Sequence, residues 1–110
     1  MKFDDYQKKA LTTALTNGDK LMDLMHWVLG VNGEAGEIAE KLKKIIRDKN
    51  GVMTKQDKVD FGKEIGDVLW YLAVLSDHLG LSFDEVAAIN LQKLADRKAR
   101  HVLSGSGDNR

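Results

Sequence analysis

The chain has 110 residues, the length of one domain with a small hydrophobic core. It carries 17 Lys and Arg against 17 Asp and Glu, so no overall field attracts nucleic acid or an anionic membrane. It has no cysteine, which excludes disulfides and thiolate metal sites, and no apolar run approaches the length of a membrane span. The first 16 residues lack the apolar core of a signal peptide. We therefore expect a cytoplasmic protein that binds neither nucleic acid nor a membrane.

Four helical segments are predicted, because the chain has no proline, is rich in Leu, Ala, Lys and Glu, and nowhere sustains alternating β-branched residues. The first is expected over about residues 5–16, with Asn17 and Gly18 ending it. The second is expected from about residue 19 or 20 to residue 48, before an Asn-Gly turn, with a weak point at the glycines of residues 30–36.

Capping patterns define the starts of the last two helices. Thr54 with Asp57 predicts a capping box that opens the third helix, and Gly80 predicts its left-handed C-terminal stop. Ser82 with Glu85 is the better of the two boxes and opens a fourth helix that ends near residue 100.

The predicted architecture is all-α: a single four-helix bundle-like domain over residues 1–103, followed by a flexible C-terminal tail at 104–110. The tail is short, polar and glycine-containing. The apolar positions of the long helices exceed what one small bundle covers, so we expect a homodimer or homotetramer. The residues that make this case are Trp27, Val28, Leu69, Trp70, Leu72 and Ala73.

Two acidic pairs are the main candidates for chemistry: Glu34 and Glu37 in GEAGE, and Glu64 and Asp67 in KEIGD. Residues three apart share a helix face, so each pair can direct its oxygens to one point. An isolated pair in a chain that is 31% charged is usually a solvated face. These pairs, however, border the apolar stripes of their helices, which favours a position at the helix-helix seam.

Four carboxylates gathered at a seam repel one another unless a cation joins them. All-oxygen ligation favours Mg²⁺, with Mn²⁺ as a plausible substitute. There is no cysteine for structural zinc, and none of His26, His78 and His101 has the Glu-x-x-His spacing of di-iron bundles. The residues therefore predict a magnesium site between the second and third helices.

The stretches VNGEAGEIAEKLKK, KEIGDVLWYLAVLSDHLGLSFDEVA and INLQKLADR resemble the MazG-like all-α nucleoside triphosphate pyrophosphohydrolases over nearly the whole chain. That family's Glu-x-x-Glu and Glu-x-x-Asp match Glu34, Glu37, Glu64 and Asp67, with 26 residues between the pairs. The resemblance implies Mg²⁺-dependent cleavage of a nucleoside or deoxynucleoside triphosphate between its α and β phosphates, in nucleotide-pool housekeeping, by a homo-oligomer. Some members carry another acid where this chain has Gly33, so the identity of the general base stays open.

Cationic and amide side chains are candidates for binding the substrate's phosphates or sugar. Asn90, Lys93 and Arg97 form one polar row on the fourth helix, and the row resembles the family's Asn-x-x-Lys segment. The alternative is a solvated face. Lys41 follows Glu37 by one turn and could reach the same phosphates, or could form only an intrahelical ion pair with it.

The remaining candidates have structural interpretations. Trp27 and Trp70 could stack on a base, but a Trp among Leu and Val is more often core or interface. The glycines of residues 30–36 lack the Gly-Lys-Ser/Thr of a phosphate loop, so close approach of two helices explains them better. Gln7 is a weak candidate for contact with the nucleotide.

Two other functions compete with the hydrolase. One is a catalytically silent helical oligomerisation or regulatory module that binds nucleotide or a protein partner; the intact acidic pairs argue against it. The other is a carboxylate-bridged redox metalloprotein, which the absence of suitably spaced histidines disfavours.

Overall fold

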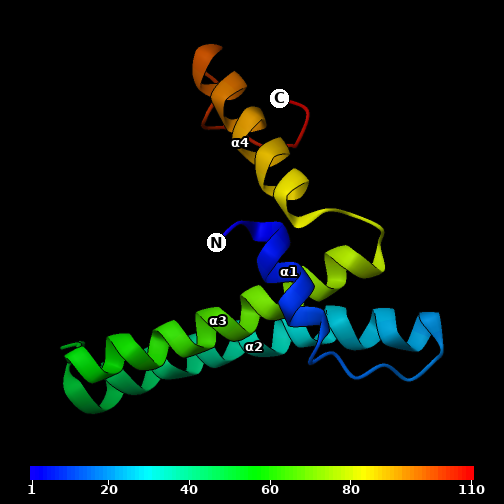
Figure 1. The fold of residues 1–110 in the computed structure, drawn as a ribbon. Helices are drawn as coiled ribbons and strands as arrows, with labels where there is room; N and C mark the ends of the chain where they lie inside the picture. Colours follow the sequence, from blue (N-terminus) through cyan, green and yellow to red (C-terminus); the bar gives the residue numbers. More distant parts are fainter.

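The computed structural model describes all 110 residues and contains four helices and no strand (Figure 1). The helices are α1 (Phe3–Leu11), α2 (Lys20–Lys49), α3 (Lys55–His78) and α4 (Phe83–Ala99). The predicted all-α class is therefore confirmed. None of these helices combines the length and the apolar character that crossing a membrane requires.

The end of α1 differs from the prediction. α1 ends at Leu11, because the hydroxyls of Thr12 and Thr13 donate to the backbone carbonyls of Lys9 (2.6 Å) and Ala10 (2.9 Å) and compete with further helical turns. α2 has nearly the predicted bounds and continues without a break through the glycines at 30–36, which were expected to be its weak point. Packing against α3 outweighs the low helix propensity of those glycines.

Both predicted caps exist, but their ranking was wrong. The Thr54 hydroxyl accepts from Asp57 N, and the Asp57 carboxylate accepts from Thr54 N, so this box is complete. Hydrogen bonds from Lys49 and Thr54 lower the pKa of Asp57 to about 2. Ser82 accepts from Glu85 N, but no reciprocal bond from Glu85 forms, so the box predicted to be better is only half made.

α2 and α3 lie side by side as a long antiparallel hairpin, and α1 crosses α3 near one end of it (Figure 1). The core lies at this crossing, where α1, α2, α3 and the first residue of α4 meet; its buried members are Ala10, Trp27, Ala73, Val74 and Phe83. α4 touches α1 and α3 only and projects away from the hairpin, so the four helices of one chain do not close around a common axis.

The N-terminal ends of α1 and α4 cap each other. The Asp4 carboxylate accepts from Asp84 N at 2.9 Å and from the Ser82 hydroxyl at 2.8 Å, while Phe3 N donates to the Asp84 carboxylate at 3.0 Å. These bonds lower the pKa of Asp4, with the bond from Asp84 N as the largest cause. Reciprocal capping therefore fixes where α4 leaves the core.

Gln7 joins three parts of the chain, so the suggestion that it contacts a nucleotide was wrong. The side chain is buried, and its amide nitrogen donates to the carbonyls of Ala73 (3.1 Å) and Leu81 (3.0 Å). Its amide oxygen accepts from Phe83 N at 3.1 Å. Every polar atom of Gln7 is therefore committed to holding α1 against α3 and the start of α4.

Gln7→Leu is expected to lower the free energy of unfolding by about 2–4 kcal/mol, because it leaves buried backbone groups without partners. Thermal unfolding followed by circular dichroism measures this. Gln56→Leu, at an exposed glutamine of α3, is the matched control and should change the free energy by less than about 0.5 kcal/mol. Equal melting temperatures of the two variants would contradict a structural role for Gln7.

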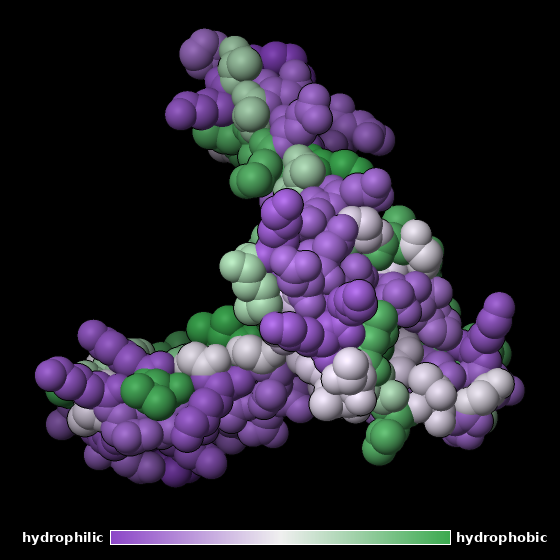
Figure 2. Space-filling model, viewed as in Figure 1, coloured by the Kyte–Doolittle hydropathy of each residue, from purple (hydrophilic) through white to green (hydrophobic).

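One chain exposes far more surface than a compact domain of its mass. Its accessible surface is 8190 Å², against about 6100 Å² expected for 12.3 kDa. Its radius of gyration is 17.0 Å, against about 13 Å for a compact chain of this length. Large apolar side chains are exposed, including those of Leu15 (84%), Ile65 (56%) and Ile89 (68%). Figure 2 shows apolar residues, in green, at several places on the surface.

Candidate metal centre

Three of the four predicted carboxylates converge between α2 and α3. Glu34 comes from α2, and Glu64 and Asp67 come from α3, where their spacing of three residues puts them on one helix face. One oxygen from each residue lies within 4.8 Å of the others. Glu34 and Glu64 are half-buried and Asp67 is exposed, so the cluster is at the seam and open to solvent.

Glu37 and Lys41 take different positions from those predicted. Glu37 is exposed, and its carboxylate is outside the converging group, although its charge still acts on Glu34. Lys41 makes no ion pair with Glu37; its ammonium lies 3.4 Å from the Glu64 carboxylate on the neighbouring helix. Lys41 is thus next to the cluster, but through an interhelical contact that helical spacing cannot reveal.

The carboxylates perturb one another and a neighbouring phenol. Partial burial raises the pKa of Glu34, and the negative charges of Asp67, Glu64 and Glu37 raise it further, in that order. Burial also raises the pKa of Tyr6 on α1, and the charge of Asp67 adds to this shift. No pattern in the sequence identifies Tyr6 as a neighbour of the site, because only the packing of α1 on α3 brings it there.

The raised pKa of Glu34 predicts a pH dependence of the metal-free protein. An acid whose pKa is higher in the folded state favours folding below its unfolded value, 4.5, and that stability is lost as the pH rises through the folded pKa. Glu34→Gln should therefore match the parent melting temperature near pH 4 and exceed it increasingly toward neutral pH. The check is a series of melting curves in EDTA, and a constant difference at all pH values would contradict it.

The donor set suits a hard divalent cation. It consists of carboxylates alone, and one ammonium, that of Lys41, lies within ion-pair distance of it. Oxygen-only ligation suits Mg²⁺ and Mn²⁺ rather than zinc or redox iron. His26 is absent from the cluster and stacks on Trp27 with ring centroids 4.5 Å apart. The residues present therefore fit the ion that the sequence predicted, and Glu34, Glu64 and Asp67 would hold it.

Close approach of α2 and α3 explains one of the three glycines beside the acidic pair. A Cβ at Gly30 would overlap the Tyr71 ring of α3, whereas one at Gly33 or Gly36 would meet no atom within 4 Å. Gly30 precedes Glu34 by four residues, and Tyr71 follows Asp67 by four. The Gly30–Tyr71 contact therefore lies one helical turn from the carboxylates and sets the spacing of the two helices there.

Both tryptophans belong to the packing around the core, as the sequence favoured. Trp27 is 2% exposed and is the largest fully buried side chain. Trp70 is half-buried, its ring meets that of Trp27 edge to face with centroids 6.0 Å apart, and its indole nitrogen donates to the Thr13 hydroxyl at 2.9 Å. Its polar atom is thus already paired within the chain.

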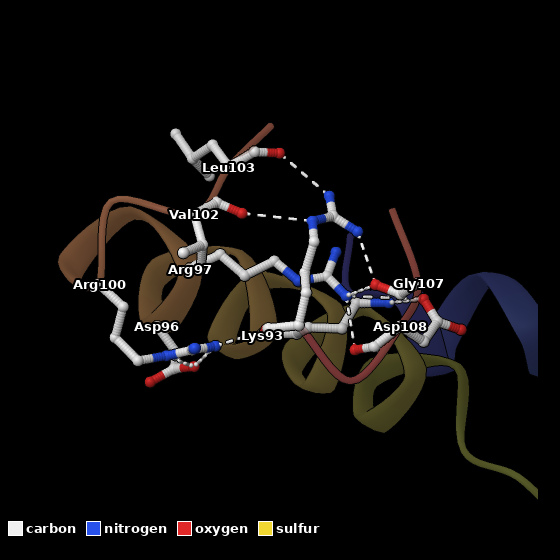
Figure 3. Close-up of polar contacts among 9 residues, drawn as sticks. Lys93, Asp96, Arg97, Arg100, Val102, Leu103, Gly107 and Asp108 are labelled. Atoms are coloured by element: carbon white, nitrogen blue, oxygen red, sulfur yellow. Dashed lines mark hydrogen bonds and ion pairs between the residues drawn. The ribbon is translucent and has the colours of Figure 1, made fainter. Parts of the chain in front are cut away.

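The row predicted on α4 lies apart from the carboxylates of the same chain, because α4 projects away from the α2–α3 hairpin that carries them (Figure 1). The Asn90 side chain is exposed and makes no hydrogen bond within the chain, Lys93 is half-buried, and Arg97 is buried. Figure 3 shows that Lys93 and Arg97 point to residues 107 and 108. The tail that was expected to be flexible is thus hydrogen-bonded along α4.

Fold and site together define an all-α protein with an acidic cluster between two long antiparallel helices. The family model described as the MazG nucleotide pyrophosphohydrolase domain matches residues 23–102, which include all four predicted carboxylates and the α4 row. The chain belongs to this nucleotide pyrophosphohydrolase family. It is also similar to the Gene 37 protein of Mycobacterium phage L5, with 46% identity over 114 aligned residues and complete coverage of both chains. No solved structure matches the chain.

Proposed function

We propose that this protein hydrolyses nucleoside or deoxynucleoside triphosphates between the α and β phosphates, with Mg²⁺ as cofactor, and releases the monophosphate and pyrophosphate. The convergence of Glu34, Glu64 and Asp67 at an open seam carries this proposal. Family membership supports it, because the acidic residues of the family motif are all present. Mn²⁺ is a plausible substitute. The cytoplasm, which holds the nucleotide pool, is the proposed location.

Each residue has a defined part in this proposal. When bound, Mg²⁺ would neutralise the negative charge that develops on the phosphates during cleavage. Glu34, Glu64 and Asp67 hold the ion, and Glu37, which faces solvent beside them, ligates or accepts a proton from the attacking water. Lys41 balances the charge of Glu64 and lies where it can contact a bound phosphate. Asn90, Lys93 and Arg97 bind phosphate or sugar.

We also propose that the protein acts as a homodimer or homotetramer. The excess accessible surface supports this, as do the exposed apolar side chains on α2 and α4. The separation of α4 from α2 supports it independently, because the α4 row can then serve the carboxylates of another copy. Light scattering coupled to size exclusion should give two or four times 12.3 kDa. A monomer that is fully active would contradict the assembly.

The test of the activity is a panel of canonical and modified triphosphates, incubated with the protein and Mg²⁺ and assayed for pyrophosphate. Release of pyrophosphate that EDTA abolishes supports the hydrolase. Absence of turnover across the panel, with circular dichroism of a folded helical protein, would favour the alternative of a silent module that binds nucleotide or a protein partner. Release of inorganic phosphate without pyrophosphate would show cleavage at a different bond.

A further inference from the structure

The C-terminal residues of the chain contact the cationic side chains of α4. After α4 the backbone reverses at His101, which has a positive φ of 58°, and residues 104–110 return along the helix (Figure 3). The Asp108 carboxylate then lies 3.5 Å from the Lys93 ammonium and 3.6 Å from the Arg97 guanidinium. Arg97 also donates to the Asp108 backbone carbonyl at 2.6 Å. One acidic residue thus bridges two side chains that were predicted to bind substrate.

Hydrogen bonds from arginine side chains hold this returning segment in place beside α4. Arg110 donates to the carbonyls of Gly107 (2.7 Å) and Leu103 (3.0 Å), and Arg100 donates to the carbonyl of Arg110 at 2.7 Å. Most acceptors in this arrangement are backbone carbonyls, and Asp108 is the only acidic side chain of the segment. Its charge is therefore the part of the segment that resembles a phosphate.

The Arg97 guanidinium offers more donors than the segment uses. The Arg97 side chain is 6% exposed, yet its Nε is buried and has no hydrogen-bond partner. A buried guanidinium is stabilised when its planar set of donors meets a carboxylate or phosphate in bidentate fashion. Asp108 does not supply this, because its carboxylate comes no closer than 3.6 Å to the guanidinium and its side chain is 87% exposed. The site is thus occupied by an anion that fits it incompletely.

From these contacts we infer that residues 104–110 are an internal competitor of the substrate, in which the Asp108 carboxylate holds the place of a nucleotide phosphate between Lys93 and Arg97. This inference rests on the proposed function, since it takes a polyphosphate as the ligand. When the polyphosphate binds, Asp108 leaves both cations and the phosphate oxygens replace it. Lys93 and Arg97 keep the pKa of Asp108 below its usual range, so Asp108 is ionised whenever it competes. The segment therefore raises the substrate concentration at which the site is half-saturated.

The test uses isothermal titration calorimetry to measure how tightly the parent protein and its variants bind inorganic tripolyphosphate in the presence of Mg²⁺. Asp108→Asn should bind it about two- to fivefold more tightly than the parent, the range expected for loss of an exposed ion pair. Asp77→Asn is the matched control, because Asp77 is an exposed aspartate of α3 that makes no ion pair. That control removes the same charge and should leave the affinity unchanged. With nucleotide, Asp108→Asn should lower KM and leave kcat as it is.

A second pair of variants separates competition from a general change in charge. In a Lys93→Gln background the gain from Asp108→Asn should shrink, since one of the two cations that Asp108 occupies is gone. Deletion of residues 104–110 should tighten binding at least as much as Asp108→Asn does. Equal affinity of Asp108→Asn and Asp77→Asn for tripolyphosphate would overturn the inference, even if the protein hydrolyses nucleotides. Tighter binding in Asp108→Asn without turnover in any variant would support it and reject the proposed hydrolase.

Discussion

Asp67→Asn is expected to lower pyrophosphate release by more than about a hundredfold, beyond the loss typical for residues that only support a metal ligand. The amide keeps the shape of the carboxylate but removes its charge and one acceptor from the group formed with Glu34 and Glu64. The same change should raise the melting temperature of the metal-free protein, because it removes one of three like charges that lie within 4.8 Å of one another. Mg²⁺ should then stabilise the variant less than the parent.

Pyrophosphate assays at saturating Mg²⁺ and melting curves in EDTA and in Mg²⁺ measure both effects. Asp77→Asn is the matched control, because Asp77 is also an exposed aspartate of α3 but makes no ion pair and lies outside the cluster. It should leave activity and metal response unchanged. An active Asp67→Asn protein, or one that is less stable than the parent in EDTA, would contradict a metal centre at this seam.

Gly30→Ala is expected to lower the free energy of unfolding by about 1–3 kcal/mol, the usual cost of overpacking. The added methyl group overlaps the Tyr71 ring. That ring is confined by Trp70, Trp27 and His26, whose centroids lie 4.9, 6.4 and 6.1 Å away. The better helix propensity of Ala offsets at most about 1 kcal/mol of this loss in the free energy of unfolding. Turnover should also fall, by up to about a hundredfold, because separation of α2 and α3 moves Glu34 away from Asp67.

Gly36→Ala is the matched control on the same helix. Its added methyl group meets no atom within 4 Å, so it should stabilise the protein by about 0.5–1 kcal/mol through helix propensity alone. Combining Gly30→Ala with Tyr71→Leu, which removes the ring, should cost less than the sum of the two single changes. Thermal unfolding measures all four proteins. A Gly30→Ala protein as stable as Gly36→Ala would show that α2 and α3 do not depend on this contact.

Local signals in the sequence predicted most helix boundaries well. The Thr54–Asp57 box and the left-handed Gly80, with φ of 74°, lie where the pattern placed them, because a cap depends on atoms within one turn of the chain. The boundary that was wrong, the end of α1, involves competition that patterns do not rank. The hydroxyls of Thr12 and Thr13 bond to nearby backbone carbonyls and end α1 early.

The candidate site was also predicted only in part, because local spacing determines a helix face but not the contacts across two helices. Spacing of three residues put Glu64 and Asp67 on one face of α3, and the apolar stripes directed both acidic pairs to the α2–α3 seam. Spacing could not tell which side chains would converge across the seam. Glu34 joins the α3 pair and Glu37 does not, while Lys41 pairs with Glu64 rather than with Glu37. These choices depend on the register of two helices, which the Gly30–Tyr71 contact sets.

The sequence by itself determined the helices, the two acidic pairs and the family to which they point, because helix periodicity and caps are properties of neighbouring residues. Only the tertiary structure decided that Gln7 is a structural link, that Tyr6 lies in the field of Asp67, and that Asp108 occupies Lys93 and Arg97. Each of these relations joins residues that are far apart in the chain or separated by a reversal of it. Their energy comes from contacts that exist only once the helices have packed, so no local pattern contains them.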